Sequence, residues 1–305
     1  MTPRRDHSAL ARRRRRGITR RISPADLLPP ESRYRPRTSG TVSSAASTFF
    51  FVFVVALAVL WFTASLWPLF LIVVTFFARA FFQRSSQLAA VQENQRAVNL
   101  LNAGRVDEAA HIFEELTRTE VNSSAHPVYV FNRGVAYMIQ GRLKRAYSLF
   151  NAVRHSRHFT TGQAASYEPL LYVEMATCLA LLGWIDEAAD HREAAAARLD
   201  RDEVARLAFV DAVIALRVRR PEQAVAVARS NWRSAEALLR VPSRKALRLI
   251  YAFALETTSG GASAEFRSLV EGVRPCRPGE FDWVGAEWPA FRAFLARHGL
   301  SDPPK

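Results

Sequence analysis

Few residues of this 305-residue chain stand in patterns that support catalysis or metal binding. His155 and His158 lie three residues apart, a spacing at which two imidazoles on one helix can share a metal ion. No carboxylate lies near them in the sequence, however, and no phosphate-binding glycine loop, nucleophile elbow or HExxH motif occurs. We therefore expect no catalytic residue, no metal site and no bound cofactor.

The paired acids and the cysteines have structural explanations. Asp107-Glu108 and Asp186-Glu187 each follow a glycine closely, so we expect them in the first turn of a helix, where negative charge is favourable. Cys178 lies in an apolar stretch and is expected in the core, while the other cysteine lies in a proline-rich loop. Two cysteines exclude a disulfide scaffold.

Positive charge is concentrated at the start of the chain. The formal net charge is +14, and residues 1–48 hold 12 arginines against 3 acidic residues. Prolines and a lack of apolar side chains predict a disordered leader over 1–41. An anionic membrane surface attracts each arginine by about 1 kcal/mol. The candidate headgroup-binding residues are Arg12, Arg13, Arg14, Arg15 and Arg16, with nucleic acid as a less favoured ligand of the same arm.

A membrane anchor is predicted after the leader. Residues 49–78 are 30 consecutive uncharged, mostly apolar residues. One helix of this length would run about 45 Å, against a hydrocarbon core of about 30 Å. Pro68 interrupts helical hydrogen bonding near the middle. We expect a transmembrane helical hairpin over 42–82, with arms at about 42–62 and 67–82. A single tilted, kinked helix is the alternative.

The topology depends on that choice. The arginine-rich leader favours a cytoplasmic N-terminus, and a hairpin returns the chain to the same side. We therefore expect the protein in a bacterial inner (plasma) membrane with its C-terminal part in the cytoplasm. A single crossing would instead give an exported protein.

The rest of the chain shows helix-length stretches and a recurring motif. A small residue is followed by a large residue three positions later, Gly four later, Ala five later and an aromatic four later. The three copies are Ala97, Leu100, Gly104, Ala109, Phe113; Gly134, Tyr137, Gly141, Ala146, Phe150; and Ala176, Leu179, Gly183, Ala188, with Arg192 in place of the aromatic residue. Gly can end a helix in the left-handed conformation, and small residues let two helices approach closely. Such helix pairs must stack to bury their apolar faces.

The motif resembles the tetratricopeptide repeat (TPR) family. The segments NLLNAGRVDEAAHIFEEL, NRGVAYMIQGRLKRAYSLF and ATCLALLGWIDEAAD carry the resemblance. A weaker fourth copy has Arg219 at the glycine position, and a fifth helix pair is expected at about 243–272. The resemblance implies an all-α solenoid of helix pairs over 83–272. Residues 273–305 are expected to form a capping helix and a tail.

The resemblance also implies a partner-binding groove lined by the first helix of each pair. The corresponding residues are Val91, Asn94, Val98, Leu101, Asn102, Val128, Phe131, Val135, Met138, Ile139, Val173, Thr177 and Leu181. Most are apolar, which suits an amphipathic helix or an extended segment of a protein partner. They could instead pack against neighbouring repeats. The expected function is a membrane-anchored TPR-like scaffold, with a nucleic-acid- or anionic-lipid-binding protein as the alternative.

Overall fold

The chain is all-helical wherever its structure is described. The computed structural model describes residues 53–54, 67–120, 125–156, 164–277 and 279–301, and within these ranges it contains helices and no strand. The expected all-α class is therefore confirmed for these residues. Among them, no helix combines the length and apolarity needed to span a membrane. The first hairpin arm and the turn near 63–66 lie almost entirely outside the described residues.

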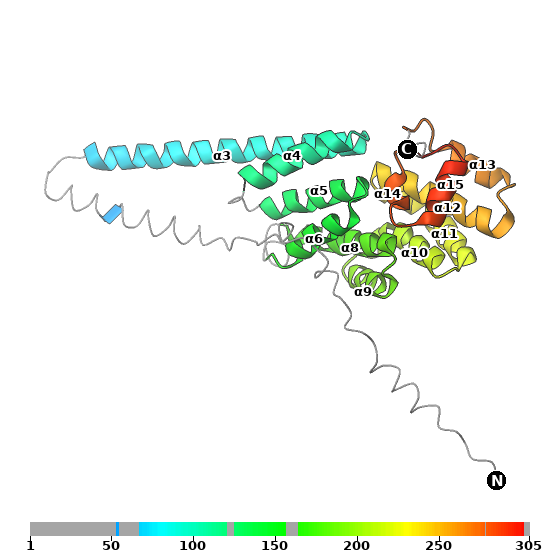
Figure 1. Cartoon of the computed structure of the whole chain (residues 1–305). Helices are drawn as coiled ribbons and strands as arrows, with labels where there is room; N and C mark the ends of the chain where they lie inside the picture. The colour runs from blue at the N-terminus through cyan, green and yellow to red at the C-terminus, as the bar shows by residue number, and fades with distance from the viewer. Residues whose placement is uncertain (1–52, 55–66, 121–124, 157–163, 278, 302–305) are drawn as a thin grey trace, which may run out of the picture.

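Most helices are arranged as antiparallel neighbours that follow one another along the chain (Figure 1). Their bounds are α3 Trp67–Asn102, α4 Val106–Thr119, α5 His126–Ile139, α6 Leu143–Arg154, η3 Ala165–Tyr167, α8 Glu168–Leu182, α9 Ile185–Ala196, η4 Arg201–Leu207, α10 Ala208–Arg217, α11 Pro221–Leu238, α12 Val241–Ser259, α13 Ala264–Glu271, α14 Asp282–Gly285 and α15 Pro289–Arg297.

The longest helix, α3, joins the expected anchor to the first repeat. Its C-terminal part lies beside α4, whereas its N-terminal part projects beyond the other helices (Figure 1). The boundary expected between residues 82 and 83 falls inside this helix. The reason is that neither proline nor glycine occurs between Pro68 and Gly104, so nothing in the sequence breaks the helix there. Val74 and Phe77 in the projecting part are 46% and 66% exposed.

The same turn joins the two helices of four successive pairs. Gly104, Gly141 and Gly183 have φ values of +75°, +74° and +83°. In each turn the next residue donates its N–H to a carbonyl five residues earlier. These bonds run from Arg105 to Leu100 (2.9 Å), Arg142 to Tyr137 (2.8 Å), Trp184 to Leu179 (2.9 Å) and Arg220 to Ala215 (2.8 Å). This is the hydrogen bond of a Schellman helix end.

Arg219 takes the glycine position in the fourth turn. It has a φ of +59°, the one positive value at a non-glycine residue in the described part of the chain. The left-handed conformation brings Cβ close to the following carbonyl oxygen, which strains any residue except glycine. The hydrogen bond from Arg220 to Ala215 is kept nevertheless, so the surrounding helices hold the turn in this conformation.

Two further helix pairs complete the fold. The fifth pair, α12 and α13, is joined through Gly260 and Gly261, both with positive φ, and Ser263 caps α13 by accepting a hydrogen bond from the Phe266 N–H (3.0 Å). The last pair is α14 and α15. The aromatic residues of α15 are buried against Phe253 of α12, with ring centroids 5.4 Å apart for Phe291 and 5.3 Å for Phe294.

Replacing Arg219 by glycine should stabilise the fold. The change removes the strain of the left-handed conformation, partly offset by the greater freedom of glycine in the unfolded chain, leaving a gain of about 0.5–1 kcal/mol. Thermal unfolding followed by circular dichroism should show a midpoint raised by about 1–4 °C. Arg219→Ala removes the same side chain and keeps the strain, so it should give no such gain. An equal gain in both variants would mean that loss of the arginine side chain, and not relief of backbone strain, raises the midpoint.

Candidate functional site

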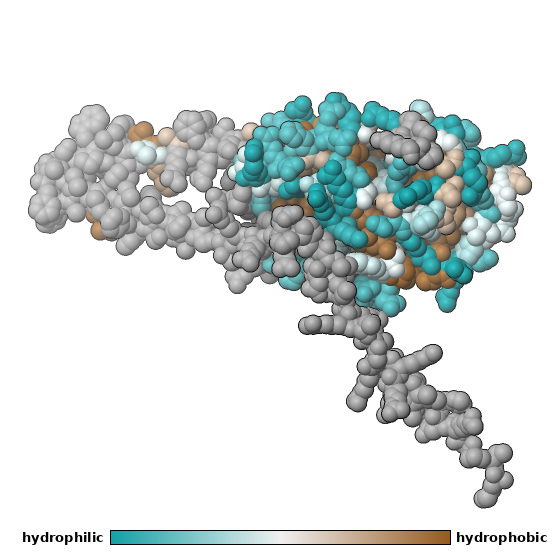
Figure 2. All heavy atoms as spheres, in the orientation of Figure 1, coloured by the Kyte–Doolittle hydropathy of each residue, from teal (hydrophilic) through white to brown (hydrophobic). Residues whose placement is uncertain are grey.

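Most of the expected groove is buried in this structure. The side chains that are at most 9% exposed are Leu101, Phe131, Val135, Met138, Ile139, Val173, Thr177 and Leu181. The face of the repeat region seen in Figure 2 carries many hydrophilic residues, with hydrophobic ones showing between them. These eight side chains belong to the core in this conformation. Of the eight, Ile139 also lines a cavity of about 930 Å³, together with Trp283 of α14.

A later part of the chain covers one of these expected groove residues. Arg240, directly before α12, forms a 3.1 Å ion pair with Glu174 of α8, and its guanidinium lies 5.6 Å from the ring centroid of Phe131 in α5. Burial raises the pKa of Glu174, and the charge of Arg240 opposes that rise. In α14, the ring of Trp283 lies 5.9 Å from that of Phe209 in α10. Arg240 therefore covers part of the expected groove from within the same chain.

Some expected groove residues remain accessible near the start of the repeats. Val91 is 52% exposed, and Leu88, one turn earlier on α3, is 59% exposed. Asn94 accepts a 2.9 Å hydrogen bond from Asn132, which joins α3 to α5. Val98, Asn102 and Val128 are half-buried. The accessible part of the expected surface is thus confined to α3 and the start of α5.

The residues expected to shape the repeats lie at the contacts between helices. Residues with no exposed surface are Ala97, Ala109, Phe113, Ala146, Phe150, Ala176, Leu179 and Ala188. Tyr137 is 8% exposed, and Leu100 is half-buried. A Cβ atom on Gly134 would lie 2.5 Å from Phe150 Cε1, so α5 and α6 approach too closely for any larger residue there. Arg192 forms a two-pronged pair with Asp211 of α10, at 2.8 and 2.9 Å.

Among the described residues, no group of three or more His, Cys, Asp or Glu side chains could hold a metal ion. His155 is exposed, with Nδ1 2.7 Å from the carbonyl oxygen of Asn151, and His158 lies outside the described residues. Cys178 is fully buried, and burial raises the pKa of its thiol well above the usual value. A thiol that stays protonated is a poor nucleophile.

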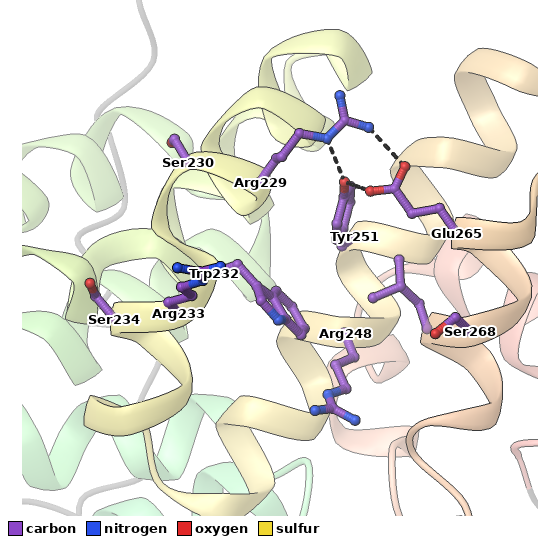
Figure 3. Close-up of a pocket in the computed structure, with 10 residues that line it drawn as sticks. Arg229, Ser230, Trp232, Arg233, Ser234, Arg248, Tyr251, Glu265 and Ser268 are labelled. Atoms are coloured by element: carbon purple, nitrogen blue, oxygen red, sulfur yellow. Dashed lines mark hydrogen bonds and ion pairs between the residues drawn. The ribbon is translucent and has the colours of Figure 1, made fainter.

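The sequence reasoning missed a cavity that opens between α11, α12 and α13 (Figure 3). Its volume of about 650 Å³ falls in the range of small-ligand sites. The lining residues are Arg229, Ser230, Trp232, Arg233, Ser234, Arg248, Tyr251, Glu265, Ser268 and Leu269. The one signal in the sequence was the repeated Arg-Ser pair in RSNWRS, which places two arginines and two serines one helical turn apart on α11.

A chain of hydrogen bonds forms one wall of the cavity. Arg229 donates from Nε to the Tyr251 hydroxyl (3.0 Å) and from Nη2 to Glu265 (2.8 Å), and Tyr251 donates to the other oxygen of Glu265 (Figure 3). The Tyr251 hydrogen bond, together with Arg229, lowers the pKa of Glu265. Burial and the bond to Glu265 raise the pKa of Tyr251. This wall therefore holds an ionised carboxylate with a guanidinium and a neutral phenol.

The other wall combines a cation with aromatic rings. Arg248 donates to the carbonyl of Gly272 (2.7 Å), pairs with Glu236, and lies 5.5 Å from the Trp232 ring centroid. The Trp232 and Tyr251 ring centroids are 6.1 Å apart. The cavity thus offers guanidinium and hydroxyl donors beside an apolar surface, an arrangement suited to an anion with a planar body.

Comparison with known proteins identifies no relative. No family model matches the chain, nor does any curated protein or any solved structure.

Adding one methyl group at Gly134 should destabilise the helix pair α5–α6. Gly134→Ala places a carbon against the Phe150 ring, and overpacking of this kind costs about 1–3 kcal/mol. The cost is measurable as a lower thermal midpoint. In a Phe150→Leu background the same change should cost clearly less, because the crowding atoms are gone. Strictly additive effects of the two substitutions would mean that this contact is not the cause.

Proposed function

We propose that this protein is a membrane-anchored, TPR-like scaffold that recruits a protein partner. The observation that carries the proposal is the continuity of α3, which runs without a break from the uncharged segment into the first repeat. A scaffold built in this way holds its partner close to the membrane. Confinement near the bilayer raises the effective concentration of the partner for other membrane proteins.

The repeat nature of the C-terminal part is supported by the four equivalent turns. Their left-handed residues occupy the same motif position, and the same backbone hydrogen bond follows each of them. The motif alanines of the second helices, Ala109, Ala146 and Ala188, are all fully buried. These are the features by which stacked helix pairs of the TPR type hold together.

The anchor is supported by composition and by exposure. Residues 49–78 contain no charge, and Val74 and Phe77 on the projecting part of α3 are exposed apolar side chains. Exposure of such groups to water is unfavourable, and contact with lipid removes that cost. A helical hairpin over 42–82 with both ends in the cytoplasm agrees best with the arginine-rich leader.

The proposed partner surface is the accessible end of the groove. Leu88 and Val91 lie one turn apart on α3, so they share one face of the helix. This face lies within the first repeat, close to the proposed anchor. An amphipathic helix of a partner could cover these two side chains through its apolar face.

Introducing charge into the uncharged segment should release the protein from the membrane. In cell fractionation the full-length chain should resist extraction by alkaline buffer, whereas the double variant Val73→Arg, Val74→Arg should be extracted. The reason is that a charged residue at the bilayer centre costs about 2.5–3.5 kcal/mol. A matched pair of arginines on the repeat surface, Val204→Arg and Val218→Arg, should leave the protein in the membrane. A wild-type chain found in the soluble fraction would contradict the anchor.

Partner binding should depend on Val91. Photocrosslinking from an amino acid analogue placed at Leu88 in the full-length protein should give one dominant adduct, identified by mass spectrometry. Val91→Asp should abolish that adduct, because binding would then bury an unpaired carboxylate. Val204→Asp introduces the same charge at a valine with 40% exposure and should leave the adduct unchanged. Adduct formation that survives Val91→Asp would remove this surface from the proposal.

A further inference from the structure

The cavity between α11, α12 and α13 contains more hydrogen-bond donors than its own acceptors use. Arg229 and Arg248 are engaged by Glu265 and Glu236 respectively. The side chains of Arg233, Ser234 and Ser268 line the same cavity and make no hydrogen bond with any described residue. All three residues are exposed to solvent, so a guanidinium and two hydroxyls remain accessible to a ligand that supplies acceptor oxygens.

From this arrangement we infer that the cavity binds a phosphate monoester carried on a planar ring. A phosphate presents three oxygens and a charge near −2, and arginine forks match its geometry. A carboxylate presents only two oxygens, and the cavity already contains a carboxylate, that of Glu265. The unused donors therefore fit the larger, more highly charged group better.

Glu265 marks the position of an anion in the site. Its carboxylate is held by Arg229 and Tyr251, yet its side chain is 43% exposed and stands in the first turn of α13. An exposed side chain can rotate out of the cavity without disturbing the core. A dianion competes with it for Arg229, so Glu265 acts as an internal competitor that a phosphate displaces.

The remaining walls suit the organic part of the ligand. Trp232 and Tyr251 present their rings to the cavity, and Leu269 adds an aliphatic surface. A volume of about 650 Å³ exceeds what a bare phosphate ion fills. A flat ring against Trp232 would bury apolar area that an inorganic ion cannot, so the ring should add affinity.

Calorimetric titration of the full-length protein in detergent micelles with phenyl phosphate tests this assignment. Phenyl phosphate should bind, and inorganic phosphate and benzoate should each bind more weakly, because one lacks the ring and the other the third oxygen. A short phosphotyrosine peptide distinguishes the source of the group. If the peptide binds, the natural ligand is a phosphorylated side chain of a protein. If only phenyl phosphate binds, the ligand is a free organic phosphate.

Three substitutions separate a built site from general charge attraction. Arg233→Gln should weaken phenyl phosphate binding about tenfold, the loss expected for one charge-assisted hydrogen bond. Glu265→Gln should strengthen binding about threefold or more, since it removes the competing charge. Arg267→Gln on α13 removes an equal charge from a residue that does not line the cavity, and should change the affinity less than about twofold.

Opposite outcomes would overturn the assignment. One is an absence of phenyl phosphate binding at millimolar concentration. Another is an equal loss of affinity in Arg233→Gln and Arg267→Gln, which would indicate attraction by surface charge alone. Arg233 and Arg267 are both exposed, so these two substitutions leave the core unchanged, and circular dichroism of each variant verifies this. The inference does not depend on the membrane anchor or on the proposed partner surface.

Discussion

Close approach of two helices within each pair is the constraint on which this fold depends. Small residues occupy the motif positions of both helices, such as Ala97 and Ala109 in the first pair and Gly134 and Ala146 in the second, and the three alanines are fully buried. Phe150 fills the space beside the second crossing so tightly that Gly134 has no room for a methyl group. Because the crossings are so tight, the turns between the helices must be short. A left-handed residue in each turn makes this possible.

Closure of the inner face is a second, long-range constraint. Arg240 joins the start of α12 to Glu174 in α8 and covers Phe131 in α5, so one side chain ties together three helices that are distant in sequence. This ion pair is partly buried, so it contributes little net stability, but it is costly to break because the carboxylate of Glu174 would lose its partner. It therefore holds the start of α12 against α8 and α5. In this position Arg240 covers the ring of Phe131, which belongs to the core.

The turns within the helix pairs could be predicted from the sequence because they depend on local residues. The covering of the inner face by Arg240 could not, because it depends on a contact between distant parts of the chain. A helix end with Gly at the left-handed position is local, so the motif around Gly104, Gly141 and Gly183 indicated its position directly. Arg240, which lies over the ring of Phe131, is more than 100 positions later in the sequence, and no local pattern encodes that contact. An apolar first helix looks the same in sequence whether a partner or the same chain covers it.

The difference between local patterns and long-range contacts also explains why the sequence did not reveal the cavity between α11, α12 and α13. RSNWRS on α11 is a common composition for an exposed helix, and its arginines alone indicate only a solvated surface. The cavity arises because Tyr251 from α12 and Glu265 from α13 stand opposite Arg229.

Departures from the repeat motif fall at junctions with other parts of the chain. Where the first two copies place phenylalanine in the core, the third has Arg192, and its guanidinium reaches Asp211 on the next pair through two hydrogen bonds. Where three copies have glycine, the fourth has Arg219, which keeps the turn at the cost of strain. At the other end, the first helix of the first copy is extended into α3, whose Asn94 is bonded to Asn132 of α5. No break separates the projecting part of α3 from this bond. The direction of the projecting part therefore fixes the orientation of the first repeat relative to it. In the proposed membrane-anchored scaffold, such a continuous helix would present one face of the repeats, whereas a flexible linker would present all of them equally.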